Sequence, residues 1–111
     1  MSKRIFVLSI ILLIIALTGC SKGGSKIKEE KFNLDVEGGT IYSTLTLPKG
    51  KEIQAIALIH AGSGPTDRDG NSPIGGDNNS LKMLAEALGD SGIASVRYDK
   101  RGIAASMALI E

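Results

Sequence analysis

Alternating apolar and polar side chains mark two extended segments in the first half of the chain. Residues 32–37 and residues 41–47 both alternate with a period of two, which is typical of strands that bury one face. Gly38 and Gly39 separate them, and glycine readily adopts the positive φ angles of a tight turn. The pattern therefore predicts a β-hairpin that ends at Pro48.

The second half of the chain predicts a strand, a helix and another strand. Residues 53–59 (IQAIALI) are almost continuously apolar, as expected for a strand that is buried on both faces of a parallel sheet. Apolar residues at i, i+3, i+4 and i+7, counted from Leu81, predict a helix over residues 80–88. Residues 93–98 form a second apolar strand.

A strand, a helix and a strand with short connections imply a right-handed crossover between two parallel strands. The predicted fold class is therefore α/β, with an N-terminal β-hairpin followed by one βαβ unit. We also expect a short helix within residues 103–111.

The N-terminus has the three parts of an export signal. Residues 3–4 are basic, residues 5–17 are apolar except for one serine, and the small residues Thr18 and Gly19 precede Cys20. The apolar run is shorter than the roughly 17 residues that a membrane-spanning helix needs. A signal peptide is therefore the better interpretation.

Residues 17–20 (LTGC) resemble the bacterial lipobox. That resemblance implies a diacylglyceryl thioether on Cys20 and makes residues 1–19 a lipoprotein signal peptide. Residues 20–31 are then the lipidated cysteine with a polar, flexible tether, and residues 32–111 are the folded part. We expect the protein on the extracytoplasmic face of the cell membrane, with the membrane as its partner. A plain secretory signal and an uncleaved anchor are the alternatives.

Composition and charge narrow the classes of function. The formal net charge is +1, so nothing in the charge points to a nucleic-acid partner. The chain has one cysteine, which excludes an internal disulfide. Neither a cofactor nor a metal ion is expected from the sequence.

The polar loop at residues 60–79 is the segment best placed to carry chemistry, because ligands bind at the carboxyl ends of strands in open α/β sheets. One interpretation is a phosphate loop. It requires G-x-x-x-x-G-K-[ST] or G-x-G-x-x-G, but after Gly62 and Gly64 the third glycine is replaced by Asp67.

A calcium loop is the second interpretation. It would use Asp67, Asp69 and Asn71 as ligands. Ser72 stands where the loop needs a glycine, and Asn78 stands where it needs a glutamate.

The third interpretation is an oxyanion loop, in which a glycine turn presents backbone N–H groups to a developing negative charge. Residues 56–73 (IALIHAGSGPTDRDGNSP) and residues 94–106 (ASVRYDKRGIAAS) carry a resemblance to a known family. They resemble the N-terminal part of α/β-hydrolase-fold esterases of the serine aminopeptidase-like or lysophospholipase-like group. The resemblance covers residues 32–106 and implies the first half of an α/β-hydrolase sheet.

The resemblance also implies two sets of site residues. These are the oxyanion-hole candidates Gly62, Ser63 and Gly64 and the loop-shaping residues Asp99, Arg101 and Gly102. In that group the position of Ser63 offers its backbone N–H to the oxyanion. Ala104 departs from the pattern, because family members usually carry a second glycine there.

Structural roles are the alternative for the polar residues around this loop. His60 is the only histidine, and a lone histidine at a strand end also fits a hydrogen-bonded structural residue. Asp99 and Arg101 also fit an ion pair or a turn that fixes the loop. Asp67 and Asp69 also fit turn formers that bond their own backbone.

The family's catalytic residues are missing from the 111 residues. Its mechanism needs a serine in G-x-S-x-G, then an acid, then a histidine. Ser63 lacks the leading glycine, and no histidine follows His60. We therefore expect an N-terminal fragment of a membrane-anchored serine hydrolase for carboxylic esters, inactive alone, with one edge of strand 53–59 unpaired. The alternative is a non-catalytic surface lipoprotein that serves as a small binding or structural module.

Overall fold

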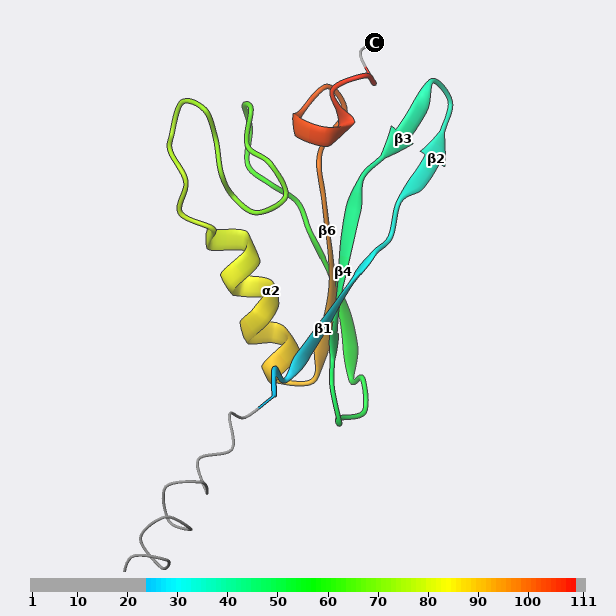
Figure 1. The fold of residues 1–111 in the computed structure, drawn as a ribbon, viewed down its shortest axis with the longest axis vertical. Helices are drawn as coiled ribbons and strands as arrows, with labels where there is room; N and C mark the ends of the chain where they lie inside the picture. Colours follow the sequence, from blue (N-terminus) through cyan, green and yellow to red (C-terminus); the bar gives the residue numbers. More distant parts are fainter. Residues whose placement is uncertain (1–23, 110–111) are drawn as a thin grey trace, which may run out of the picture.

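The structure is a computed structural model that describes residues 24–109. Its elements in chain order are β1 (Ile27–Lys31), β2 (Leu34–Val36), β3 (Gly39–Ile41), β4 (Ser43–Pro48), β5 (Ala55–Ile59), α2 (Ser80–Asp90), β6 (Ile93–Tyr98) and the 3-10 helix η1 (Ala104–Ser106). Strands β1, β4, β6 and β5 form one sheet in that order, and β2 pairs with β3 in a small second sheet (Figure 1). The predicted α/β class is confirmed.

The predicted hairpin exists, but it is longer than the pattern indicated. Across the turn at Gly38, where φ is 91°, β2 pairs with β3. Beyond that pairing the two chain segments continue side by side: the Phe32 N–H donates to the Ser43 carbonyl at 3.1 Å, and the Ser43 N–H donates to Asn33 Oδ1 at 3.1 Å. Strand β4 then pairs antiparallel with β1.

Strand β1 corrects the prediction of a flexible tether up to residue 31. Residues 27–31 pair with β4 as an edge strand, so the folded part begins at Ile27. The segment looked like a tether because four of its five residues are charged. Those charges suit an edge strand, which natural proteins often protect with charged side chains. One of them, Glu29, also meets a buried arginine of β6.

The βαβ unit is confirmed, with small changes at its ends. Strand β5 starts at Ala55 rather than residue 53, and α2 runs two residues further than predicted, to Asp90. Strands β5 and β6 are parallel, with Ala57 opposite Ser95. Within residues 24–109, β5 has a neighbour on one side only and lies at the edge of the sheet.

Helix α2 covers one face of the sheet (Figure 1). At Gly89 of α2 an added Cβ would lie 2.5 Å from Ile27 Cγ2, so the helix and the sheet are in close contact. The opposite face is open in the described part of the chain, where Ile56 is 72% exposed and Leu58 is 71% exposed. The prediction that this strand is buried on both faces therefore does not hold for residues 24–109.

Candidate functional site

The glycine turn at residues 62–64 leaves the carboxyl end of β5, immediately after the buried Ala61. Gly64 has a φ of +87°, a conformation that side chains rarely adopt. Apart from the adjacent residues in the chain, no residue has an atom within 4 Å of a Cβ built at Gly62 or Gly64, so the space beside the turn is open. Among residues 24–109, the N–H groups of Gly62, Ser63 and Gly64 donate no hydrogen bond.

The carbonyl groups of the same turn are held from the neighbouring strand end. Lys100, two residues beyond β6, donates from Nζ to the Gly62 carbonyl and, at 2.9 Å, to the Gly64 carbonyl. Within residues 24–109, the turn therefore has bonded carbonyl oxygens at Gly62 and Gly64, and its three N–H groups are free.

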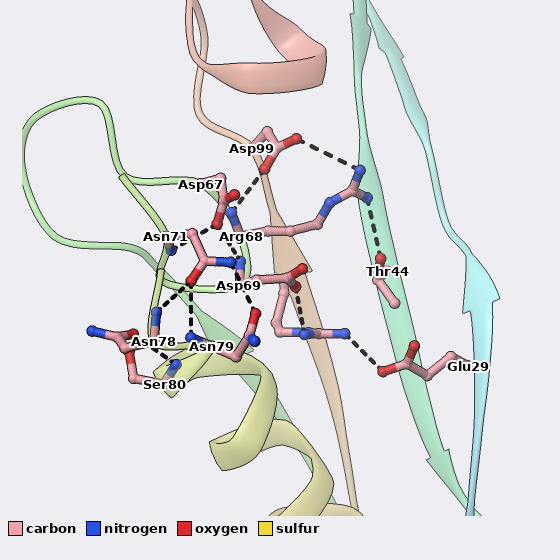
Figure 2. Close-up of polar contacts among 11 residues, drawn as sticks. Glu29, Thr44, Asp67, Arg68, Asp69, Asn71, Asn78, Asn79, Ser80 and Asp99 are labelled. Carbon is pink, nitrogen blue, oxygen red and sulfur yellow. Dashed lines mark hydrogen bonds and ion pairs between the residues drawn. The ribbon is translucent and has the colours of Figure 1, made fainter. Parts of the chain in front are cut away.

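The following loop is held by two short polar side chains (Figure 2). Asp67 Oδ1 accepts hydrogen bonds from the N–H of Asp69 at 2.8 Å and of Asn71 at 2.9 Å, so it acts as a turn former. Asn71 Oδ1 accepts from the N–H of Asn78 at 2.9 Å and of Asn79 at 2.8 Å, directly before α2. These bonds give the polar loop a fixed shape.

The loop is tied to the sheet by buried Asp99, which is 2% exposed (Figure 2). Its carboxylate accepts from the N–H of Arg68 at 2.8 Å and of Ala105 at 3.2 Å, and it lies 3.6 Å from the Arg68 guanidinium. Asp99 thus connects the loop after β5 with the loop after β6. The cationic partner is Arg68 and not Arg101, which is exposed and makes no ion pair within residues 24–109.

A second ion-pair network lies under the loop and was missed by the sequence analysis. Arg97 is 1% exposed, and its two terminal nitrogens contact Asp69 Oδ1 at 2.7 Å and Glu29 Oε1 at 2.9 Å. Asp69 is therefore an ion-pair partner and not a turn former. An arginine within an apolar strand was the available signal, because a buried arginine requires acceptors.

Two further residues, Gly102 and His60, have structural positions in the site. Gly102 has a φ of +73°, and its N–H donates to the Ser106 carbonyl at 3.1 Å, which closes the loop after β6. His60 Nδ1 lies 2.5 Å from the Tyr98 hydroxyl, which matches the hydrogen-bonded structural alternative for this residue.

The calcium interpretation finds no support in this geometry. Asp67 turns toward backbone N–H groups and Asp69 toward Arg97, so the two carboxylates do not converge on one point. In the described part of the chain, no group of three or more potential metal-ligating side chains is assembled.

Ala104, the residue that departs from the family pattern, has a φ of +45°. We expect Ala104→Gly to raise the free energy of unfolding by about 1 kcal/mol, because only glycine takes this left-handed conformation without steric cost. Urea denaturation measures the change. The control is Ala105→Gly in the same turn, which should lower stability by about 0.5–1 kcal/mol. Equal losses in both variants would contradict the strain at Ala104.

Comparisons with known proteins support the fold. No protein-family model and no curated protein matches the chain. It is similar to a cold-adapted esterase from an Arctic intertidal metagenomic library, solved with bound polyethylene glycol, with a TM-score of 0.54 and 22% identity over 78% of this chain and 33% of that one. It is also similar to brefeldin A esterase, a bacterial homologue of human hormone sensitive lipase, with a TM-score of 0.50 and 16% identity over 78% of this chain and 24% of that one.

At these identities the likeness establishes the fold alone. The chain has a partial α/β-hydrolase-like fold and spans at most about a third of the length of the two esterases. Cys20 and the predicted signal peptide lie outside the described residues. Within residues 24–109, no helix has the length and apolar character needed to cross a membrane.

Proposed function

We propose that this chain supplies the oxyanion-binding part of a serine hydrolase that acts on carboxylic esters or related acyl bonds. The observation that carries the proposal is the glycine turn after β5: its N–H groups are free within residues 24–109, and its Gly62 and Gly64 carbonyl oxygens are bonded to Lys100. Acyl transfer passes through a tetrahedral intermediate with a negative oxygen. Backbone N–H groups arranged in advance at such a turn stabilise that charge.

The nucleophilic serine that the mechanism needs can be supplied by a further strand beside β5. The outer edge of β5 is free within residues 24–109, and Ser63 lies in the turn that follows the carboxyl end of this strand. Under the proposal, a further strand pairs with this edge and ends in the nucleophilic serine, so that the nucleophile and the Ser63 N–H share one side of the sheet. Because the 111 residues hold no G-x-S-x-G and no histidine after His60, we expect the 111-residue chain to hydrolyse no ester alone.

The hydrolase proposal is tested by capture with a biotinylated fluorophosphonate, which labels activated serines. Membranes of the native host are labelled, washed under native or denaturing conditions, and digested with trypsin. Recovery of the peptide from Glu52 to Arg68 after the denaturing wash places the nucleophile on the same polypeptide. Recovery of the peptide after the native wash, but not after the denaturing wash, places the nucleophile on a separate partner polypeptide. Absence of the peptide from both fractions contradicts the proposal and favours a non-catalytic lipoprotein.

We further propose that the hydrolase is held at the membrane by a lipid on Cys20, as residues 17–20 suggest. Wild-type protein is expected to incorporate labelled palmitate and to sediment with membranes, because two or three acyl chains anchor stably. Cys20→Ser should lose both properties, whereas Ser21→Ala should keep them. A free thiol on Cys20 in the mass spectrum of the mature protein would contradict the anchor.

A further inference from the structure

We infer that Lys100 is a positioning residue for the oxyanion turn and fixes the direction of the Ser63 N–H; the catalytic part of this inference rests on the proposed function. Lys100 Nζ donates to the carbonyl oxygens of Gly62 and Gly64, the residues on either side of Ser63. The backbone of Lys100 is itself fixed by a turn, in which its carbonyl accepts from the Ile103 N–H at 3.0 Å.

Peptide geometry converts this contact into an orientation. The Gly62 carbonyl and the Ser63 N–H belong to one planar trans peptide and therefore point in opposite directions. A Gly62 oxygen held against the Lys100 ammonium directs the Ser63 N–H to the other side of the turn. The second contact, at Gly64, involves the peptide before Pro65, which has no N–H. Neither contact consumes a donor that an oxyanion would need.

The turn has few other restraints. Glycine at positions 62 and 64 leaves the backbone with wide conformational freedom, and no residue other than the adjacent ones has an atom within 4 Å of an added Cβ at either position. Within residues 24–109, no other hydrogen bond reaches the carbonyls of Gly62 or Gly64. Hydrogen bonds from a charged donor are roughly twice as strong as neutral ones, so the ammonium is a strong local restraint.

The ammonium also changes the chemistry of the peptide it holds. A cation at the Gly62 oxygen polarises the peptide group, and polarised peptides donate stronger hydrogen bonds through the N–H at their other end. Lys100 therefore orients the Ser63 N–H toward the site of a negative oxygen and strengthens the hydrogen bond that this N–H can donate. An interaction of this kind acts mainly on the transition state and hence on kcat.

The test uses Lys100→Met, Lys100→Arg and the control Lys49→Met, whose lysine is exposed and lies just after β4. The first measurement is the amide NMR signal of Ser63 in the whole chain, in detergent micelles with nitrogen-15-labelled serine. Lys100→Met should shift and broaden this signal, Lys100→Arg should partly restore it, and Lys49→Met should leave it unchanged. Circular dichroism checks that all variants remain folded.

The second measurement is ester turnover by the active protein from the native host carrying the same substitutions. Lys100→Met should lower kcat by about 10- to 100-fold with little change in KM. An unchanged Ser63 signal in a folded Lys100→Met variant overturns the inference, as does a raised KM with an unchanged kcat. If the wild type has no turnover, the proposed function fails, while the Ser63 signal still decides whether Lys100 fixes the turn.

Discussion

Replacing Glu29 by Gln and Asp69 by Asn together is expected to lower the free energy of unfolding by about 3–5 kcal/mol. The double substitution leaves Arg97, which is 1% exposed, without a counter-charge. Its two terminal nitrogens lose contacts of 2.9 Å and 2.7 Å with charged oxygens, and its Nε already has no partner in the described structure. A buried charge without a partner is among the most destabilising changes a protein can undergo.

The control for this prediction uses the unequal burial of the partners. The side chain of Arg97 is 2% exposed, but those of Glu29 and Asp69 are 37% and 36% exposed. Removing the arginine leaves carboxylates that water can still reach, so Arg97→Met should cost less than the double substitution. Adding Arg97→Met to the double variant should recover most of the lost stability. Chemical denaturation gives all three values, and a triple variant no more stable than the double variant would contradict the account.

Gly70→Ala is expected to lower the free energy of unfolding by about 3 kcal/mol. Gly70 has a φ of +90°, and an added Cβ would lie 2.5 Å from Ser80 Oγ and 3.1 Å from the backbone nitrogen of Leu81. The hydroxyl group can rotate away, but the Leu81 nitrogen is fixed because its N–H donates to the Asp69 carbonyl at 3.0 Å. The substitution therefore forces apart the polar loop and the start of α2.

Gly76→Ala is the matched control for this substitution. Gly76 has a similar φ of +83°, but no residue other than its chain neighbours has an atom within 4 Å of an added Cβ. Gly76→Ala should lower the free energy of unfolding by about 1–2 kcal/mol, which is the cost of the left-handed backbone alone. The difference between the two variants in urea denaturation isolates the close contact at Gly70. Equal losses would show that the loop moves away from α2 without resistance.

The elements with a regular apolar period were predictable from the sequence, and a charged edge strand was not. The bounds of strand β6 were predicted correctly, because residues 93–98 are mainly apolar and lie between two turns. The sequence of β1 resembles that of a flexible tether, because the interactions that stabilise this strand are made with distant residues. They are the pairing with β4 and the ion pair between Glu29 and Arg97. A local pattern does not contain those long-range partners.

In the candidate site, too, local features could be predicted from the sequence and long-range contacts could not. The glycine turn and the Asp67 turn are encoded locally, because glycine and aspartate favour these backbone shapes by themselves. The partners that hold the site, Lys100 for the turn and Arg68 for Asp99, lie more than 30 residues away from the groups they contact. Their assignment required the strand order, which brings the ends of β5 and β6 together.

The proposed function requires β5 to be an interior strand in the working protein. The Gln54 N–H donates to the Gly92 carbonyl on the β6 side at 3.0 Å, and N–H directions alternate along a strand. The Ile56 N–H therefore faces β6, and the Ala57 N–H faces the outer edge.

Amide hydrogen exchange, resolved by residue on protein from the native host, tests this claim most directly. If a further strand carries the nucleophile, Ala57 and Ile56 are both protected, because both N–H groups are bonded within the sheet. If Ile56 is protected but Ala57 exchanges as fast as an unstructured peptide, the outer edge of β5 is bare and the claim is wrong.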